Sequence, residues 1–429
     1  MNTVTSDAIS DLDVSRYRAD FPILDRTAAS GAKLAFLDNA ASTQRPNSVV
    51  DAMSDCYRRY YANVHRGIHT LSEESTHAYE QSRKSVAKFI AAPSDRQVIF
   101  AGGATAAINT VARTWGDANL GPDDVILLTI AEHHANIVPW HQLAARTGCR
   151  VEFLPIDDQF TIADDVVVEA LDRLKPKLFA FTAASNTLGT VFPVKRWTAL
   201  AHDHGATVLV DAAQAAPHAV VDVQDWDIDF LAFSGHKVCG PTGIGVLYGK
   251  EPILDAMPPF MGGGGMIHKV TTGGFSCAEL PEKFEAGTPP IVEAIGLAAA
   301  VEYLADIGLD RIAAHEHRLC QHADDGLRQI DGVDVVGPTP DHKGGIVSFH
   351  VDGVHAHDVS QQLDTRGIAV RAGHHCTMPL HHHLKLSATT RASFYFYNTV
   401  EEADRLIEAV REVRQKFAPS GRKRRRRSE

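Results

Sequence analysis

The feature that most constrains the fold is a regular alternation of short apolar runs and helix-like stretches between about Asp95 and Gly249. The stretches between the runs, such as Thr105–Trp115 and Val194–His204, have the spacing of amphipathic helices. Strand–helix alternation of this kind builds a mostly parallel sheet that is covered on both faces, so we predict an α/β fold. The apolar runs are Gln97–Thr105, Asp124–His134, Leu178–Gly189, Thr207–Gln214 and Asp229–Lys237.

Polar residues stand at or just after the carboxyl ends of these runs. In sheets of this class the ligand binds in the crevice at the carboxyl ends of the strands. We therefore expect these side chains to converge in space. They are Thr105, His133, Asn186, Asp211, Gln214, Ser234, His236 and Lys237.

A second, smaller alternation follows a helical pattern at about Ile291–Ile307. It predicts a second α/β domain from about Ala305 to Ala418. Its elements are expected at Gly345–Val351, His357–Arg366 (helix), Ile368–Arg371, Thr390–Tyr397 and Val400–Phe417 (helix).

The composition of the 429 residues is typical of a globular protein, with 42 Lys and Arg against 53 Asp and Glu and a net charge of −11. The first residues lack the basic and apolar stretches of a signal peptide. The longest apolar runs, such as Val125–Ile130, fall far short of the ~18 residues of a membrane span. We therefore expect a cytoplasmic protein with no membrane partner. The six cysteines are scattered without a CxxC pair, which favours reduced thiols over disulfides.

The C-terminus carries the basic run Arg422–Arg427 (RKRRRR). Such a run cannot pack against a core, so we expect residues 419–429 to form a disordered, solvated tail. The acidic balance of the rest of the chain disfavours nucleic acid as the main partner.

Lys237 and Asp211 carry the strongest chemical signal. An amine at a rigid strand end, such as Lys237, can form a Schiff base with an aldehyde. Asp211 ends a buried strand, where a carboxylate needs a cation or hydrogen-bond donors. A protonated pyridine nitrogen would be such a cation, and that pairing makes pyridoxal 5′-phosphate (PLP) an electron sink. The two residues together indicate a PLP site.

A phosphate group could bind at Gly102–Thr105 (GGAT), between a strand and a helix. The free N–H groups of the helix N-terminus and the Thr105 hydroxyl suit a phosphate dianion. The chain has no GxxxxGK[ST] motif and no complete GxGxxG motif, which disfavours a P-loop or a dinucleotide fold. His133 could stack on a flat ring, and a hydrogen-bonded loop histidine is an equally good interpretation of that residue.

Cys376 is the candidate nucleophile, in the segment Arg371–Cys376 (RAGHHC). Flanking imidazoles and an arginine can hold a thiolate at neutral pH, and Gly373 gives the loop freedom to move. Arg391 can form a bidentate pair with a carboxylate, which fits an amino-acid substrate. The alternative is a metal site, which we disfavour because adjacent side chains of a histidine triplet diverge. Its ligands would come from His374, His375, Cys376 and His381–His383.

Several long motifs resemble those of the Suf-type (group II) cysteine desulfurases, which belong to the class V aminotransferase branch of fold-type I PLP enzymes. The resemblance extends from about Tyr17 to Phe417. One departure is Ala104-Thr105-Ala106, where relatives commonly carry Thr-Thr-Glu, so that phosphate binding relies more on backbone N–H groups. The motifs are Tyr61–Leu71 (YANVHRGIHTL), Glu132–Trp140 (EHHANIVPW), Ser234–Lys237 (SGHK), Gly240–Gly245 (GPTGIG), Phe284–Pro289 (FEAGTP), Arg371–Cys376 and Arg391–Thr399 (RASFYFYNT).

The resemblance implies a role for each candidate residue. Lys237 would hold PLP covalently, Asp211 would pair with the pyridine nitrogen, and His133 would stack on the ring. Asn186 and Gln214 would lie near the ring and its hydroxyl group. The phosphate would be bound by Thr105, Ser234 and His236, and by Thr288 from the other subunit of a homodimer. Arg391 would bind the substrate carboxylate, Arg371 would line the loop, and Cys376 would accept the sulfur.

The resemblance also implies a domain division and a reaction. A large PLP-binding domain would span residues 31–304, and a small domain carrying the Cys376 loop would combine residues 1–30 with 305–418. The reaction would convert L-cysteine to L-alanine and leave a persulfide on Cys376. A Suf-system acceptor protein would take the sulfur for iron–sulfur cluster assembly. Asp352–Val359 resembles the segment that meets zinc-bearing acceptors, so His357 is the expected contact.

Two other functions remain open at this stage. The same scaffold could act as a selenocysteine lyase, with L-selenocysteine as substrate, or as another PLP-dependent C–S lyase. A non-enzymatic metal- or nucleic-acid-binding protein could use the histidine clusters and the basic tail. That interpretation leaves the pairing of Asp211 with Lys237 unexplained.

Overall fold

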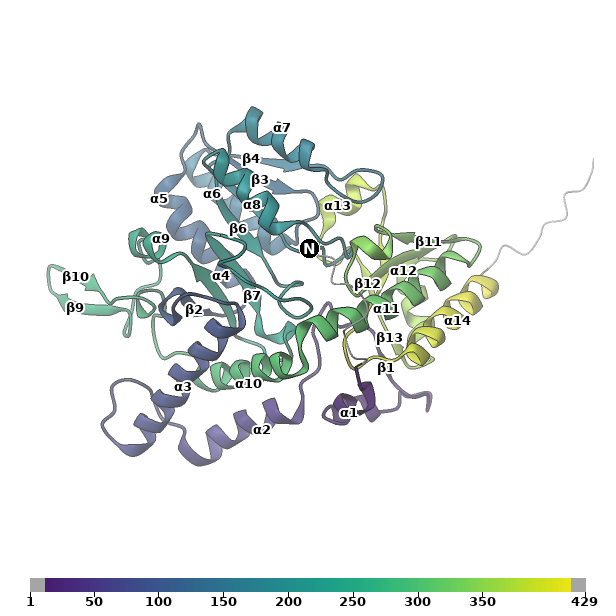
Figure 1. Ribbon diagram of the computed structural model, residues 1–429, viewed down its shortest axis with the longest axis horizontal. Helices are drawn as coiled ribbons and strands as arrows, with labels where there is room; N and C mark the ends of the chain where they lie inside the picture. Colours follow the sequence, from purple (N-terminus) through teal and green to yellow (C-terminus); the bar gives the residue numbers. More distant parts are fainter. Residues whose placement is uncertain (1–11, 418–429) are drawn as a thin grey trace, which may run out of the picture.

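The computed structural model describes residues 12–417, which form a large α/β unit beside a smaller one (Figure 1). Within these residues the large unit contains a seven-stranded sheet with the order β2-β8-β7-β6-β5-β3-β4. Its neighbouring strands run parallel except for β8, which is antiparallel to β2 and β7. The strands are β2 (Val98–Ala101), β3 (Val125–Thr129), β4 (Arg150–Leu154), β5 (Leu178–Thr182), β6 (Thr207–Asp211), β7 (Phe230–Ser234) and β8 (Gly245–Gly249).

The predicted apolar runs are confirmed as strands of this sheet. β3, β5 and β7 are buried at every position, as expected for parallel strands with helices on both faces. The sequence pattern missed β4, which is only partly buried, and β8, whose run begins with a glycine. That glycine, Gly245, is needed because a Cβ there would lie 2.5 Å from the Gly103 Cα.

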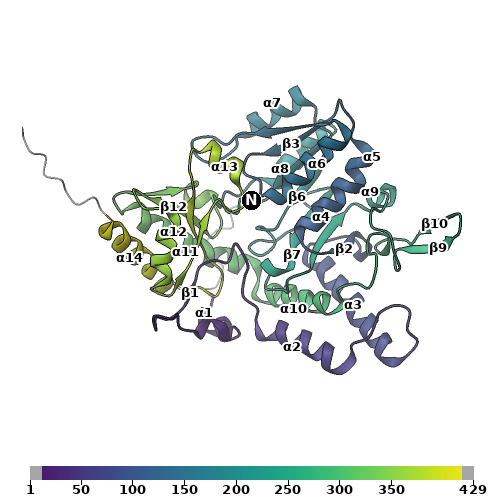
Figure 2. The ribbon, with the colours of Figure 1, turned by 180° about the vertical axis from the view of Figure 1, so that it is seen from behind.

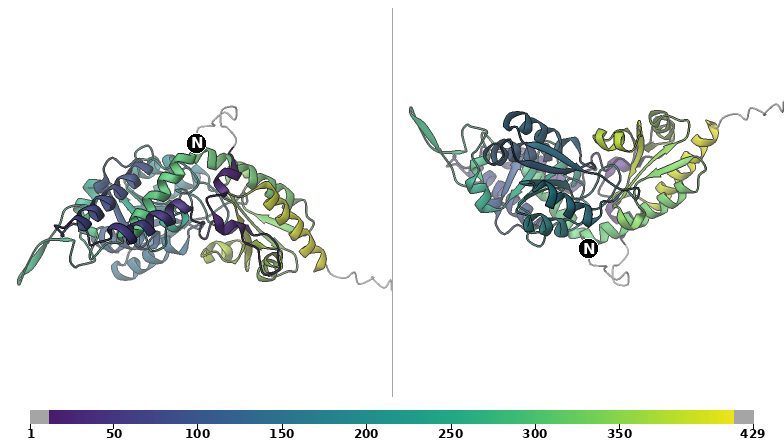
Figure 3. Two further views of the ribbon diagram at one scale, coloured as in Figure 1. Left: turned by 90° about the horizontal axis from the view of Figure 1, so that it is seen from below. Right: turned by 90° about the horizontal axis from the view of Figure 1, so that it is seen from above.

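Helices cover both faces of the large sheet, and α10 leads directly into α11 (Leu309–Arg328), so that the two helices extend from the large unit into the smaller one (Figures 1 and 2). α10 packs against α2 and α3 and spans the residues that the sequence predicted. A hairpin of β9 (Ile267–Thr271) and β10 (Gly274–Cys277) projects from the large unit, away from the smaller one (Figure 3). The helices of the large unit are α2 (Asn47–Asp55), α3 (Thr70–Phe89), α4 (Ala104–Val111), α5 (Asp117–Asn119), α6 (Val138–Thr147), α7 (Asp164–Leu174), α8 (Val194–Asp203), α9 (Glu251–Ala256) and α10 (Ile291–Ile307).

The smaller unit is built on an antiparallel sheet with the order β11-β12-β15-β14. α14 begins with a capping box between Thr399 and Glu402 and packs against α11 and α12. The strands are β11 (Val333–Val336), β12 (Ile346–Val351), β14 (Arg371–Gly373) and β15 (Thr389–Ser393). The helices are α1 (Val14–Arg18), α11 (Leu309–Arg328), α12 (Ala356–Asp364), α13 (Met378–His383) and α14 (Val400–Lys416).

A short parallel pair joins the N-terminal segment to the C-terminal unit. β1 (Ala35–Phe36) pairs with β13 (Ile368–Ala369), and Ala35 and Leu37 belong to the hydrophobic core beneath β12 and α14. The sequence placed this segment in the large domain, from residue 31 onward. We propose instead that the smaller domain includes the chain up to Leu37.

The predicted tail at residues 419–429 lies outside the described residues, as do residues 1–11. In the part of the chain that the structure does describe, no helix has the length and apolarity that a membrane crossing needs.

Candidate active site

A cavity of about 340 Å³ lies at the carboxyl ends of β6 and β7, between the two units. Its volume is within the range of small-molecule sites. Three predicted residues in the described chain, Gln214, Thr288 and His357, do not line it. The predicted residues that line it are Thr105, His133, Asn186, Asp211, Ser234, His236, Lys237, Arg371, Cys376 and Arg391.

Lys237 and Asp211 come from neighbouring parallel strands. Asp211 is the last residue of β6, and Lys237 follows the end of β7 in a single helical turn. Burial lowers the pKa of Lys237 to about 8, and the Asp211 charge opposes this effect. Burial raises the pKa of Asp211, and the Lys237 charge opposes that effect. The arrangement gives an amine that loses its proton near pH 8 and a buried carboxylate that a cation would stabilise.

The N-terminus of α4 forms a cradle against the end of β7. Gly103 has a φ of +123°, which favours glycine, and the backbone N–H of Ala104 donates to Ser234 Oγ at 2.9 Å. Thr105 lies in the first turn of α4 and lines the cavity. The first N–H groups of a helix have no partner within the helix, so this end of the cavity suits a phosphate.

His133 and Gln214 also bear on whether PLP fits. Burial lowers the pKa of His133 to about 3, and the Lys237 charge adds to this effect, so the ring is neutral and can stack on a flat ring. Gln214 Nε2 donates to the Ala40 carbonyl oxygen at 2.7 Å. Gln214 Oε1 is buried and accepts no hydrogen bond within residues 12–417. Gln214 does not line the cavity, so the fit of the residues present to PLP rests on Lys237, Asp211 and the cradle at Ser234.

Glu132 lies behind the cavity, and the sequence analysis gave it no role. Its carboxylate is fully buried and accepts from Thr129 Oγ1 at 2.5 Å, from the Thr182 N–H at 3.0 Å and from Asn136 Nδ2 at 2.7 Å. Burial raises its pKa to about 8. These bonds fix the loop that carries His133. The sequence did contain a signal for this role, because Glu132 is an acidic residue that follows a buried strand and directly precedes His133.

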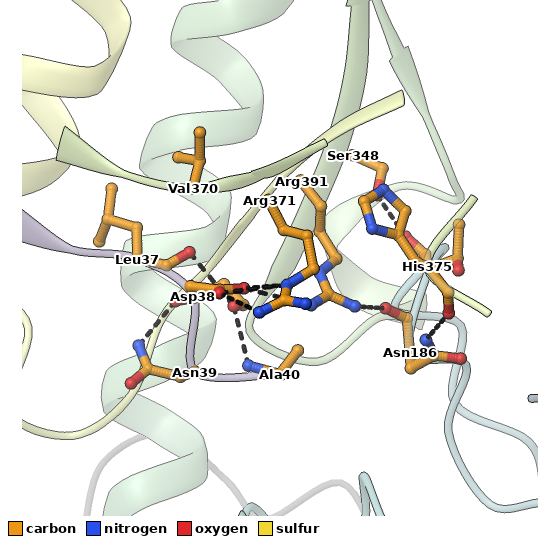
Figure 4. Close-up of polar contacts among 12 residues, drawn as sticks. Leu37, Asp38, Asn39, Ala40, Asn186, Ser348, Val370, Arg371, His375 and Arg391 are labelled. Carbon is orange, nitrogen blue, oxygen red and sulfur yellow. Dashed lines mark hydrogen bonds and ion pairs between the residues drawn. The ribbon is translucent and has the colours of Figure 1, made fainter. Parts of the chain in front are cut away.

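Arg371, Arg391 and Asp38 form a charged cluster at the side of the cavity that belongs to the smaller unit (Figure 4). Arg391 is 2% exposed and donates to the Asn186 carbonyl oxygen at 2.7 Å. Burial lowers its pKa to about 10, and the Asp38 charge opposes this effect. Arg371 forms a bidentate pair with Asp38, with contacts of 2.8 and 3.1 Å. Asp38 was not predicted, because its run of sequence gave no periodic signal.

Cys376 is exposed, and its loop is conformationally strained. Both His375 (φ 51°) and Cys376 (φ 58°) lie in the left-handed region, which costs energy for residues other than glycine. The large unit holds this loop in place. Asn186 Nδ2 donates to the His375 carbonyl oxygen at 2.7 Å, and the backbone N–H of His134 donates to the Cys376 carbonyl oxygen at 2.8 Å. Cys376 thus lines the cavity from a loop that residues of the large unit hold in place.

Two histidines near Cys376, His375 and His381, form side-chain hydrogen bonds. His375 Nε2 and Thr389 Oγ1 are 2.9 Å apart, and His381 Nε2 lies 3.2 Å from the same hydroxyl. Among the described residues, the three side chains close enough to share an ion are Asp334, His350 and Asp352, which are not part of this loop.

Thr288 and His357 lie away from the cavity. Thr288 is exposed in the segment before α10, so its predicted role stays a prediction that requires a second subunit. His357 is exposed on α12 and lines a separate cavity of about 370 Å³.

The chain belongs to the aminotransferase class-V family, which it matches over residues 35–406. Among curated relatives, a probable cysteine desulfurase of Halobacterium salinarum is 50% identical over 95% of this chain and 98% of its own length. A cysteine desulfurase of Haloferax volcanii is 47% identical over the same shares.

A solved structure is also closely similar. The apo cysteine desulfurase of Thermococcus onnurineus superimposes with a TM-score of 0.90 at 39% identity, over 95% of this chain and 99% of that one. The predicted class V aminotransferase family, the α/β fold, the PLP cofactor and cysteine desulfuration as the reaction are thereby confirmed, while the Suf-type group stays a prediction.

Proposed function

We propose that this chain is a PLP-dependent cysteine desulfurase that converts L-cysteine to L-alanine and carries the released sulfur on Cys376. The observation that supports this most directly is that Lys237, Asp211 and Cys376 line one cavity. The sulfur acceptor and the cofactor-binding lysine must both reach one bound amino acid, and a single cavity allows that. The relatives' names assign cysteine desulfuration to them.

The residues would divide the work as follows. Lys237 and Asp211 would hold PLP, with the phosphate at Ser234 and the α4 N-terminus. When bound, PLP stores the negative charge that forms when the substrate Cα loses its proton. The Lys237 Nζ, with its lowered pKa, takes that proton and returns one to the substrate. Arg391 binds the substrate carboxylate.

Cys376 performs the sulfur transfer. Its thiolate attacks the substrate sulfur, the Cβ–S bond breaks, and an S–S bond forms on the enzyme. The electron pair of the broken bond stays with the carbon fragment, which takes up protons and leaves as alanine. An exposed loop suits this step, because a persulfide must next meet an acceptor from solution.

We propose three further features of the assembly. An acceptor protein of the Suf system, zinc-bearing in some relatives, binds beside α12, where His357 lines a cavity with Ser360, Gln361 and Asp364. The enzyme forms a homodimer, in which Thr288 of one subunit reaches the phosphate site of the other. The protein works in the cytoplasm.

The test measures alanine and sulfide release from L-cysteine by the holoenzyme and by Cys376→Ala, together with the visible spectrum of each. We expect Cys376→Ala to keep the cofactor's absorption and to lose sulfur release. Cys277→Ala, at a partly exposed cysteine of the β9–β10 hairpin, is the matched control and should behave as wild type. Sulfide release by Cys376→Ala at the wild-type rate would reduce the assignment to a general PLP-dependent lyase.

A further inference from the structure

Arg371 and Arg391 lie directly opposite each other on the antiparallel strands β14 and β15. Like charges in this register destabilise a sheet. The Asp38 carboxylate lies beside both guanidinium groups (Figure 4). Two positive charges and one negative charge therefore leave this cluster with one net positive charge, which is the complement of one carboxylate.

Asp38 does not contact the two arginines equally. Arg371 donates to both of its oxygens, through Nε at 3.1 Å and Nη2 at 2.8 Å. Arg391 reaches it only through Nη2 at 3.4 Å, which is a weak hydrogen bond. The buried Nε of Arg391 has no hydrogen-bond partner within residues 12–417. Arg371 is thus neutralised, while Arg391 keeps unused donors.

The backbone fixes the position of Asp38. The residue follows β1 and forms a parallel bridge to Ser393, at the end of β15. Two residues later, Ala40 is bound by the side chain of Gln214 from the large unit. Asp38 is 16% exposed, whereas the Arg371 side chain is 50% exposed and lines the cavity. Without Asp38, Arg371 would be a second free guanidinium group at the cavity.

We propose that Asp38 is a positioning residue that sets substrate selectivity by occupying Arg371, so that the cavity offers a single carboxylate site at Arg391. This inference rests on the proposed function, in which Arg391 binds the substrate carboxylate. An amino acid with an uncharged side chain fits such a site. An amino acid with a second carboxylate meets the negative charge of Asp38 and an arginine that is already paired.

The experiment compares binding of L-alanine and L-aspartate to the holoenzyme, from the change in visible absorption on titration. We expect Asp38→Asn to bind aspartate at least tenfold more tightly relative to alanine than wild type does. Asp38→Glu keeps the charge and should keep the wild-type ratio. Adding Arg371→Met to Asp38→Asn should remove the gain for aspartate. A loss of packing alone would weaken both ligands together and leave their ratio unchanged, which would overturn the inference.

A second variant keeps the inference testable if Asp38→Asn fails to fold. In Arg371→Met, Asp38 is free to pair with Arg391, so alanine should bind several-fold more weakly. Unchanged alanine binding in this variant would contradict the inference. Arg391→Met tests the proposed role of Arg391 as the residue that binds the substrate carboxylate. If that variant binds alanine as well as wild type does, the carboxylate site is not at Arg391. Neither result depends on sulfur release, which tests the proposed function separately.

Discussion

The two sides of the cavity are built in opposite ways. On the large unit, Lys237 and Asp211 stand at the ends of strands that are buried along nearly their whole length. On the smaller unit, Cys376 is exposed, and its backbone lies in the left-handed region. Burial shifts pKa values on both sides, at Lys237 and Asp211 on the large unit and at Arg391 and His375 on the smaller one, so the exposed thiol is what sets the smaller unit apart. The exposed side has a strained loop of the kind that costs about 1–2 kcal/mol per residue.

This difference fits the two tasks of a desulfurase. Holding a cofactor and moving a proton require groups that are fixed and removed from water. Carrying sulfur to another protein requires a thiol that solvent and a partner can reach. Hydrogen bonds from Asn186 and His134 hold the strained loop, so the large unit controls a group that belongs to the smaller one.

The largest expected effect is on the buried side. In the proposed mechanism Lys237 supplies both the covalent link to PLP and the proton-transferring amine, so cysteine turnover of Lys237→Ala should fall by more than about 10³-fold. Alanine formation and the visible spectrum are the measurements. Lys195→Ala, at an exposed lysine paired with Asp225, should leave both unchanged. Substantial turnover by Lys237→Ala would contradict the proposal that the large unit supplies the group that holds the cofactor and moves the proton.

Arg391→Lys tests the arginine of the smaller unit that is proposed to bind the substrate carboxylate and that contacts Asn186 of the large unit. Lysine keeps the charge but loses the planar donors that match a carboxylate, so KM for L-cysteine should rise about 30-fold with a smaller change in kcat. Steady-state kinetics of alanine release give both constants. Arg146→Lys, at a surface arginine paired with Asp117, is the control. An effect confined to kcat would argue that Arg391 does not bind the substrate.

The positions of Lys237 and Asp211 on the large unit could be predicted from the sequence, and those of the residues on the smaller unit only in part. Parallel strands bring their carboxyl ends to one edge, so apolar runs ending in Asp211 and Lys237 sufficed to place both residues. No periodic pattern fixes a loop conformation, so the left-handed backbone at Cys376 could not be predicted. Asp38 was missed because its role depends on Arg371 and Arg391, which lie more than 300 positions later in the chain. The sequence pattern also missed β8, because its run begins with Gly245, where a Cβ would lie 2.5 Å from the Gly103 Cα.

Thr187→Val tests whether the large unit holds the Cys376 loop. The Thr187 and Thr377 hydroxyl groups lie 2.9 Å apart, and neither residue lines the cavity. Loss of this bond, about 1 kcal/mol, should lower kcat for sulfur release about fivefold by misplacing the thiol, with the visible spectrum unchanged. Thr190→Val, which removes a bond to Phe160 instead, is the control. Equal kcat values for Thr187→Val and wild type would show that the loop is held without this contact.

The smallest effect concerns acid stability, and it arises from the loop's own buried histidine. Burial lowers the pKa of His375 to about 2, from an ordinary value near 6.5. Its stabilising contribution is therefore complete above pH 6.5 and is lost as the pH falls toward 2, because the unfolded chain binds the proton first. His375→Gln should lose about 1 kcal/mol less stability than wild type between pH 7.5 and 5.5, measured by urea unfolding. His383→Gln, at an exposed neighbour, should match wild type. Identical pH dependence in all three proteins would mean that His375 takes up a proton in the folded state, and the loop would then be as open to water as its cysteine.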